Sequence, residues 1–352
     1  MKSVVLRLQI ATIFVGSIVG AGVCSGRELN QFFATYGIIG FLGVFLCGLL
    51  YIILGKMIVK ITEENKVRSY DEFVNLVSPK YVAKFINIVL TLFLLSSTSI
   101  ILAGSGSILN QYFGLPKWVG FVIMVGCSSV FLLRNTEGLF EVNSLVVPTL
   151  FIMMTALFVE YIKVQPQSLS YSYLRILPRQ KEHLLTSTMI YISFNILTVI
   201  GVLVPLTTEL NKPKEVIKGI QLGSIILTVI SSYIVFLMLV NPFHAKHYEI
   251  PLLGIASAIH PILQVGILGV MWLEMFSSQV SNVYSLCYFM ESQFKLDYKI
   301  SIFLVIALAT PFSVIGFSKL VEFLYPMYGI LSLVFLAYCI LYYFQTREKR
   351  RD

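Results

Sequence analysis

The chain has 352 residues, of which 57% are hydrophobic and 12% are charged, and its mean hydropathy is +0.84. Soluble domains carry about 25% charged residues, so this composition excludes a soluble globular protein and indicates a polytopic membrane protein. The net charge of +8 is explained by membrane topology, so it does not indicate a nucleic-acid partner.

Ten apolar segments predict ten transmembrane helices, the first of them interrupted, with the lipid bilayer as the surrounding partner. They cover approximately residues 5–33, 37–59, 85–110, 118–134, 139–162, 184–210, 217–241, 262–289, 300–316 and 320–344. The longest connection, residues 163–183, leaves no room for a separate soluble domain. The fold class is therefore an all-α membrane protein.

The distribution of positive charge predicts the orientation of these spans. With the N-terminus in the cytoplasm, 18 of the 26 Lys and Arg residues fall on the cytoplasmic side and 8 fall outside. Cytoplasmic segments of membrane proteins are enriched in Lys and Arg. We therefore expect a cell-membrane protein with both termini cytoplasmic and a short basic tail that anchors the C-terminus.

The first span contains an unusual cluster of glycines in the stretch GSIVGAGVCSGRE, from Gly16 to Glu28. Glycine weakens a helix, and unwound chain within a bilayer is tolerated only where it lines a cavity. One interpretation is a broken helix whose freed amides and carbonyls bind a ligand. The substrate-binding candidates there are Gly20, Ala21, Gly22, Cys24 and Ser25, and the new helix start suits a carboxylate. The alternative is close helix packing through the Gly16 and Gly20 pair.

The third and sixth spans supply further polar candidates. Ser105 in the third span, between Gly104 and Gly106, either lines the substrate pocket or packs closely against a neighbouring helix. In the sixth span, Asn195 offers an amide and Phe194 an aromatic ring, although a membrane asparagine also serves as an interhelical hydrogen bond. Asn195, Gly201 and Pro205 predict a second helix break.

Five spans precede the connection 163–183 and five follow it. This count suggests two halves of opposite orientation, residues 1–162 and 184–352. Secondary transporters with such inverted repeats have broken first helices in each half.

The eighth span carries an acidic residue at mid-membrane depth, Glu274. Ser277, Ser278, Ser281, Asn282 and Ser285 follow on the same helical face. An ionisable residue at this depth indicates function by default: it can exchange a proton, or oppose the charge of a cation. The alternatives are that Glu274 ties helices together, for example by pairing with Arg27, and that the serines bond back to their own helix.

The stretch ATIFVGSIVGAGVCSGREL resembles the first span of the YkvI-type bacterial membrane proteins. More distantly, it is similar to the first helix of the amino acid–polyamine–organocation superfamily, the LeuT-like fold. The resemblance implies a 5+5 inverted repeat with substrate held between broken spans 1 and 6. It also implies an ion-coupling site that joins carbonyls of Gly20 and Val23 to Ser277 and Ser278, with Glu274 nearby. Arg27 departs from the family pattern, where a neutral glutamine is expected.

No catalytic motif or metal-ligand spacing is present, so we expect no enzyme activity, no metal site and no cofactor apart from Na⁺ or H⁺ as a coupling ion. The sequence predicts a secondary transporter of a small solute, an amino acid or related amine. The alternative is a membrane receptor of the same fold that binds its ligand without transport. The sequence does not define the substrate, the coupling ion or the oligomeric state.

Overall fold

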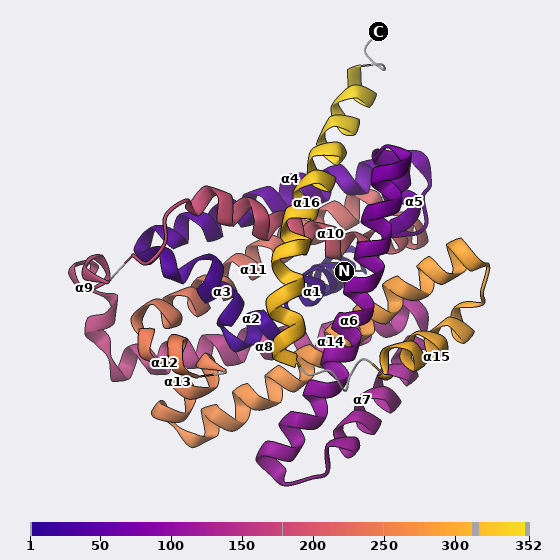
Figure 1. Cartoon of the computed structure of the whole chain (residues 1–352). Coiled ribbons are helices and arrows are strands. Elements are labelled where there is room, and N and C mark those ends of the chain that lie inside the picture. Colours follow the sequence, from indigo (N-terminus) through magenta and orange to yellow (C-terminus); the bar gives the residue numbers. More distant parts are fainter. Residues whose placement is uncertain (1, 178, 249, 312–316, 349–352) are drawn as a thin grey trace.

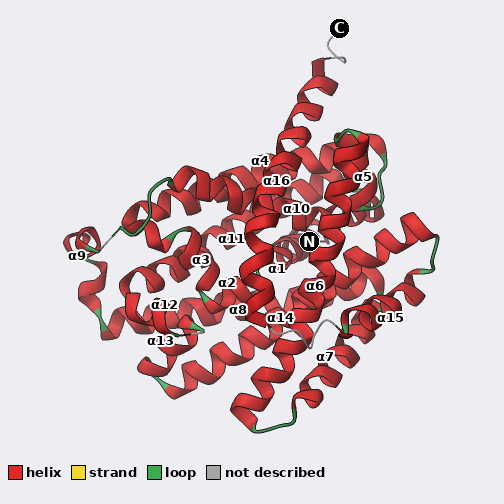
Figure 2. Cartoon of the chain, in the orientation of Figure 1, coloured by secondary structure: helices red, strands yellow, loops and turns green. Residues whose placement is uncertain are grey.

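The computed structural model describes residues 2–177, 179–248, 250–311 and 317–348. Every regular element in these ranges is helical (Figure 2), as the composition predicts. In chain order the elements are α1 (Lys2–Ile18), α2 (Ala21–Ser25), α3 (Arg27–Phe32), the 3-10 helix η1 (Ala34–Ile39), α4 (Gly40–Asn65), α5 (Tyr70–Val77), α6 (Lys80–Phe113), α7 (Lys117–Leu132), α8 (Asn135–Val164), the 3-10 helix η2 (Pro166–Leu169), α9 (Tyr171–Ile176), α10 (Leu184–Leu210), α11 (Pro213–Val240), α12 (Pro242–His247), α13 (Pro251–Ile259), α14 (Pro261–Phe294), α15 (Tyr298–Ala309) and α16 (Phe317–Glu348).

All ten predicted spans fall on helices. Within the described residues, six helices are long and apolar enough to cross a membrane, and four shorter apolar helices accompany them. In the ninth span, α15 ends at Ala309, and residues 312–316 of the predicted span lie outside the described residues. The last four residues of the basic tail, 349–352, also lie outside them.

The bundle is arranged around α1 and α10. Helix α1 packs against α8 and α11, and α10 packs against α4, α14 and α16. Helix α14 also contacts α6 and α8. In Figure 1, α16 (yellow) crosses the front of the bundle and its C-terminal end extends beyond the other helices. The interior is continuous from the first span to the eighth.

Two connections fold into short helices. The segment between α4 and α6 forms α5, which buries Tyr70, Phe73, Val74 and Val77. The connection between α11 and α14 forms α12 and α13, and each begins at a proline, Pro242 and Pro251. Proline fixes φ near the helical value and has no amide hydrogen to lose at a helix start. This connection packs onto α2, α8 and α14.

The predicted break in the sixth span is wrong. Helix α10 runs without interruption from Leu184 to Leu210, with Asn195, Gly201 and Pro205 inside it. Gly201 is used for close packing, since a Cβ atom there would lie 2.5 Å from Ser285 Oγ in α14. A membrane helix tolerates an internal proline where neighbouring helices enclose it. The first span alone has the predicted gap.

Candidate functional site

The first span is broken between α1 and α2. Helix α1 ends at Ile18, and Gly20 is extended, with φ −120° and ψ −171°. Helix α2 then contributes only five residues before a second interruption at Gly26, where φ is 83°. A side chain at such a positive φ is strained, and a Cβ at Gly26 would also lie 2.8 Å from the Met238 sulfur atom. Glycine is therefore required at the second interruption.

Close packing holds the end of α1 in place. A Cβ atom at Gly16 would overlap Asn143 Oδ1 in α8 and lie 2.8 Å from Ser277 Oγ in α14. Ser277 in turn donates a hydrogen bond of 2.8 Å to Asn143 Oδ1. The packing alternative considered for Gly16 is thus correct at this position, and it coexists with the break one turn later.

Helix α14 supplies the polar partner of the break. Ser278 Oγ donates to the Val19 carbonyl oxygen over 3.2 Å. It also lies near Gly20, because a Cβ atom there would be 3.6 Å from the same oxygen. A carbonyl released from helix pairing needs a new partner when it is buried. The hydroxyl of Ser278 provides it from a helix that is distant in sequence.

The carbonyls of Gly20 and Val23 are placed differently. The Gly20 carbonyl accepts from the Cys24 amide, and the Val23 carbonyl accepts from the Gly26 amide, each over 3.0 Å. The bond from the Cys24 amide to the Gly20 carbonyl is the first helical hydrogen bond of α2. The amides of Gly22 and Val23 come before it in the chain, so they have no acceptor within the helix. The structure thus brings the Val19 carbonyl, rather than the carbonyl of Gly20 or Val23, to the Ser278 hydroxyl.

Glu274 lies one turn before the serine pair in α14 and is fully buried. Neither carboxyl oxygen has a hydrogen-bond partner among the described residues. The carboxyl group lies within electrostatic range of the Cys24 thiol in α2, which is also fully buried. A buried carboxyl group without a partner is costly in free energy, which makes Glu274 a candidate functional residue.

The remaining polar stripe of α14 faces other helices of the bundle. Asn282 donates to Ser97 Oγ in α6 over 2.9 Å, and Ser285 bonds back to the Ser281 carbonyl. Ser281 and Ser285 are both buried. The stripe therefore faces protein, as the predicted periodicity requires.

Sequence reasoning missed a second buried acid, Glu28 in α3. Its side chain is 8% exposed, and a Cβ atom at Gly22 would lie 2.5 Å from Glu28 Oε2. The carboxyl group therefore covers Gly22 at the start of α2. The phenol of Tyr191 from α10 lies beside it. The available signal was its position inside the first apolar segment, where an ionisable residue indicates function.

The other predicted residues are buried but bond locally. Asn195 donates to the Tyr191 carbonyl of its own helix over 3.0 Å, and Ser25 donates to the Gly22 carbonyl over 2.9 Å. Ser105 bonds back to Leu102, and its carbonyl faces Gly120 in α7. The structure thus places Ser105 at the contact between α6 and α7. The Ala21 side chain lies outside the described residues.

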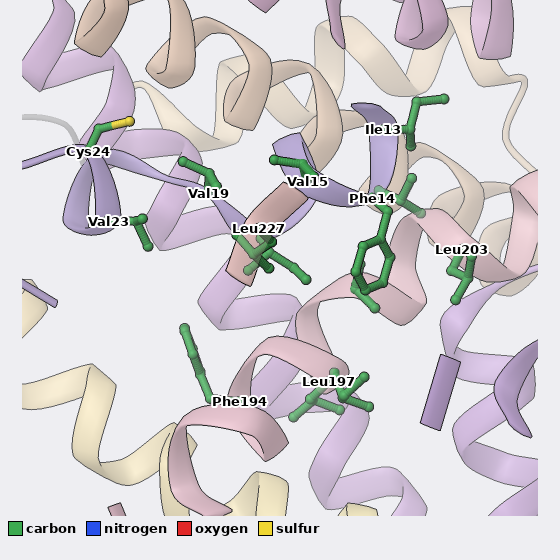
Figure 3. Close-up of a cluster of buried hydrophobic side chains, with 14 of the residues drawn as sticks. Ile13, Phe14, Val15, Val19, Val23, Cys24, Phe194, Leu197, Leu203 and Leu227 are labelled. Atoms are coloured by element: carbon green, nitrogen blue, oxygen red, sulfur yellow. The ribbon is translucent and has the colours of Figure 1, made fainter. Parts of the chain in front are cut away.

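Apolar side chains from α10 and α11 pack near the broken span. Phe194 is buried and meets Phe93 of α6 edge to face, with ring centroids 5.2 Å apart. Figure 3 shows Val19, Val23 and Cys24 of the broken span in one apolar cluster with Phe194, Leu197 and Leu227. Phe194 therefore belongs to the apolar wall of the same region as the break.

Helices α12 and α13 cover the end of the broken first span that is expected to face the outside of the cell. Arg27 Nη2 donates to the Tyr248 carbonyl over 3.2 Å, in the turn between these two helices. Leu252 of α13 lies against Gly26. Arg27 thus contacts the connection between α11 and α14.

A small cavity lies beside α10, with a volume of about 10 Å³. Its walls include Phe33, Tyr51, Tyr191 and Thr228. That volume corresponds to about one water molecule, so the described interior is closely packed around this point. Within the described residues, no group of three or more His, Cys, Asp and Glu side chains could hold a metal ion.

The chain matches no protein-family model. It is 30% identical to the membrane protein YkvI of Bacillus subtilis over 338 residues, which cover 94% of each chain. Among solved structures it is similar to a Na⁺-coupled sialic acid symporter in a substrate-bound outward-open state, with TM-score 0.68 and 14% identity, covering 93% of this chain and 75% of the symporter. It is also similar to MhsT in complex with L-phenylalanine, with TM-score 0.67 and 15% identity, covering 96% and 88%.

These similarities extend over nearly the whole chain, and the structural ones include the bundle that contains the broken first span. They show a LeuT-type fold in a multi-pass membrane protein. The chain belongs to the YkvI family of bacterial membrane proteins.

Proposed function

We propose that the protein is a secondary active transporter of a small solute, an amino acid or a related amine, and works by alternating access. The observation that carries this proposal is the break between α1 and α2, where Ser278 of α14 holds the Val19 carbonyl beside the unpartnered, buried Glu274. Helix breaks of this kind at mid-membrane are where secondary transporters bind their cargo. Binding of L-phenylalanine by MhsT supports a solute of this size.

The arrangement of oxygen atoms supports cation coupling. The Val19 carbonyl and the hydroxyls of Ser277 and Ser278 are oxygen ligands, the type preferred by hard cations such as Na⁺, and Glu274 adds negative charge. Na⁺ coupling in the similar sialic acid symporter supports this ion. Proton coupling through Glu274 is the second form of the same proposal. Glu274 supplies its negative charge either to the coupling cation or to the amino group of the cargo.

Two further inferences complete the proposal. The halves 1–162 and 184–352 are inverted repeats, and both termini lie in the cytoplasm, which the distribution of Lys and Arg supports. The continuous α10 changes the expected site in one respect: apart from the Gly201 carbonyl, whose amide donor Pro205 removes, its mid-helix carbonyls are used within the helix, so side chains such as Phe194 and Asn195 are its contribution.

A thermal-shift screen of amino acids and aliphatic amines, with and without Na⁺ and between pH 5 and pH 8, tests the proposal. A ligand at a hundred times its Kd stabilises the folded protein by about 2.7 kcal/mol, which such a screen detects. We expect Glu274→Gln to remove the dependence on Na⁺ or pH, or to weaken binding at least tenfold. The matched control is Glu141→Gln, an exposed acid of α8 paired with Arg134.

Ligands found in the screen are then tested for uptake into proteoliposomes under Na⁺ and proton gradients. Uptake driven by one gradient supports a transporter. Saturable binding without flux under any gradient contradicts transport and identifies the receptor alternative. A Glu274→Gln protein that binds and transports like wild type over the whole pH range contradicts the role given to Glu274.

A further inference from the structure

The interior around α2 contains two acids and no base. Among the described residues, the buried charged side chains are Glu28, Asp71 and Glu274, and no Lys, Arg or His side chain is buried. Asp71 lies apart in α5, where Ser292 and Gln293 donate to it. Arg27, the neighbour of Glu28, is exposed and reaches the Tyr248 carbonyl. A positive charge for Glu28 and Glu274 must therefore come from a bound species or a proton.

The two acids do not converge on one metal ion. Cys24, Glu28 and Glu274 are all described, yet they form no group that could hold a metal. Both carboxyl groups lie within electrostatic range of the Cys24 thiol in α2. The carboxyl groups of Glu28 and Glu274 therefore lie near the same short helix, α2, but at two different positions.

The surroundings of the two acids differ in chemistry. Glu274 lies one turn from the hydroxyls of Ser277 and Ser278, an oxygen-rich setting that suits an inorganic cation or a proton. Glu28 lies beside Tyr191, whose ring contacts Phe32 and Phe33 at centroid distances of 5.1 Å and 5.0 Å. Aromatic rings next to a carboxylate suit an organic ammonium group, which gains from both.

A third group near Glu28 lacks a well-aligned partner. The Tyr51 side chain is 2% exposed, and its hydroxyl makes no hydrogen bond of normal geometry among the described residues, although the Asn195 side chain lies beside it. Tyr51 and Tyr191 both line the small cavity between α4, α10 and α11. A buried hydroxyl without a well-aligned partner costs free energy, and a ligand N–H would donate a hydrogen bond to its oxygen.

We propose that Glu28, Tyr51 and Tyr191 form the subsite that binds the amino group of the cargo, and that Glu274 with the serine pair handles the coupling ion. This assignment rests on the proposed function and deepens it, because it makes a cationic amino group the required feature of the cargo. The Glu28 carboxyl group, which covers Gly22, accepts from the ammonium group, and the Tyr51 hydroxyl accepts a second N–H.

Three matched probes test this assignment: norleucine, pentylamine, which lacks its carboxyl group, and hexanoate, which lacks its amino group. Kd is measured by thermal shift and by isothermal titration on the detergent-solubilised full chain. We expect norleucine and pentylamine to bind to wild type and hexanoate not to bind. Glu28→Gln should weaken pentylamine binding at least tenfold, since it removes the charge that opposes the ammonium group.

Tyr51→Phe gives a second readout that a folding defect in Glu28→Gln cannot obscure. The hydroxyl makes no hydrogen bond of normal geometry in the free protein, so its removal should leave the melting temperature nearly unchanged or raise it. Binding of pentylamine should weaken about threefold to tenfold, the effect of one lost hydrogen bond. Glu274→Gln should keep pentylamine binding and lose the response to Na⁺ or pH.

The outcomes separate this assignment from the proposed function. Pentylamine binding that is unchanged in both Glu28→Gln and Tyr51→Phe overturns the assignment and leaves transport standing. Binding of hexanoate without pentylamine also overturns it. Lower melting temperature in Glu28→Gln with an unchanged pentylamine Kd shows that Glu28 only holds α3 to α10. Failure of every amino acid and amine to bind wild type overturns both proposals together.

Discussion

The first and sixth spans have similar helix-weakening residues, yet only the first is broken. Gly20 is extended between α1 and α2, whereas Gly201 and Pro205 lie inside the continuous helix α10. The difference lies in the neighbouring helices. Ser278 of α14 donates a hydrogen bond to the Val19 carbonyl. Ser285 of the same helix, which lies opposite Gly201, donates to the Ser281 carbonyl of its own helix.

This comparison shows that a glycine permits a break but does not cause one. In hydrocarbon, each main-chain group that leaves the helical ladder needs another partner, at a cost of several kcal/mol if none is found. The break is therefore stable where a neighbouring helix presents a donor at the right height. In α10 the helix continues past Pro205, which removes the amide donor of the Gly201 carbonyl alone, and Gly201 serves close packing.

The largest expected effect on stability comes from adding a methyl group at Gly16, where the end of α1 packs closely against α8 and α14. Gly16→Ala should lower the free energy of unfolding by about 1–3 kcal/mol, because the new methyl group overlaps Asn143 and Ser277. Thermal unfolding in detergent measures it. Gly126→Ala in α7 is the control, since nothing lies within 4 Å of a Cβ atom there. Equal changes in melting temperature for the two variants would contradict the packing described for Gly16.

A smaller effect is expected when the external partner of the break is removed. Ser278→Ala should lower the free energy of unfolding by about 1 kcal/mol, because the buried Val19 carbonyl loses its donor. Hydrogen exchange should rise in peptides that cover residues 18–26 and stay unchanged in α10. Ser128→Ala is the control, as that buried serine bonds only to Val125 of its own helix. Unchanged exchange at the break would show that Ser278 does not maintain it.

The smallest effect is expected in α10. Pro205→Ala restores a main-chain donor to the Gly201 carbonyl, so we expect a gain of at most about 1 kcal/mol in the free energy of unfolding, with ligand binding retained. Pro148→Ala in α8 is the matched control, since that proline also lies inside a helix. Loss of ligand binding in Pro205→Ala alone would show that α10 must bend, and the contrast between the two spans would then fail.

Local sequence patterns predicted the spans and the first break, because the length of an apolar segment and the density of glycine depend only on residues that are neighbours in the sequence. The partner of the Val19 carbonyl was not predictable in the same way. Ser278 is 259 residues away, and its register against α1 depends on how the whole bundle packs. For this reason the resemblance to the LeuT-like fold implied the carbonyls of Gly20 and Val23, one to four residues beyond the carbonyl that Ser278 meets.

Glu28 and α10 were misjudged for different physical reasons. Glu28 follows Arg27 directly, and only the charge of Arg27 was weighed, although in α3 the Glu28 side chain is buried and the Arg27 side chain is exposed. Helix α10 was expected to break because Asn195, Gly201 and Pro205 each weaken an isolated helix. Their cost is offset by enclosure within the bundle, which a single sequence does not report.

Helix α2 is joined to the chain by Gly20 at one end and Gly26 at the other. A rotation about these two glycine hinges would reorient its five residues while α1 stays docked on α8 and α11. The moving part of the first span would then be a plug of about 7.5 Å, given the rise of 1.5 Å per residue, instead of a whole transmembrane rod. A segment this short can reorient without displacing a full transmembrane helix within the bilayer.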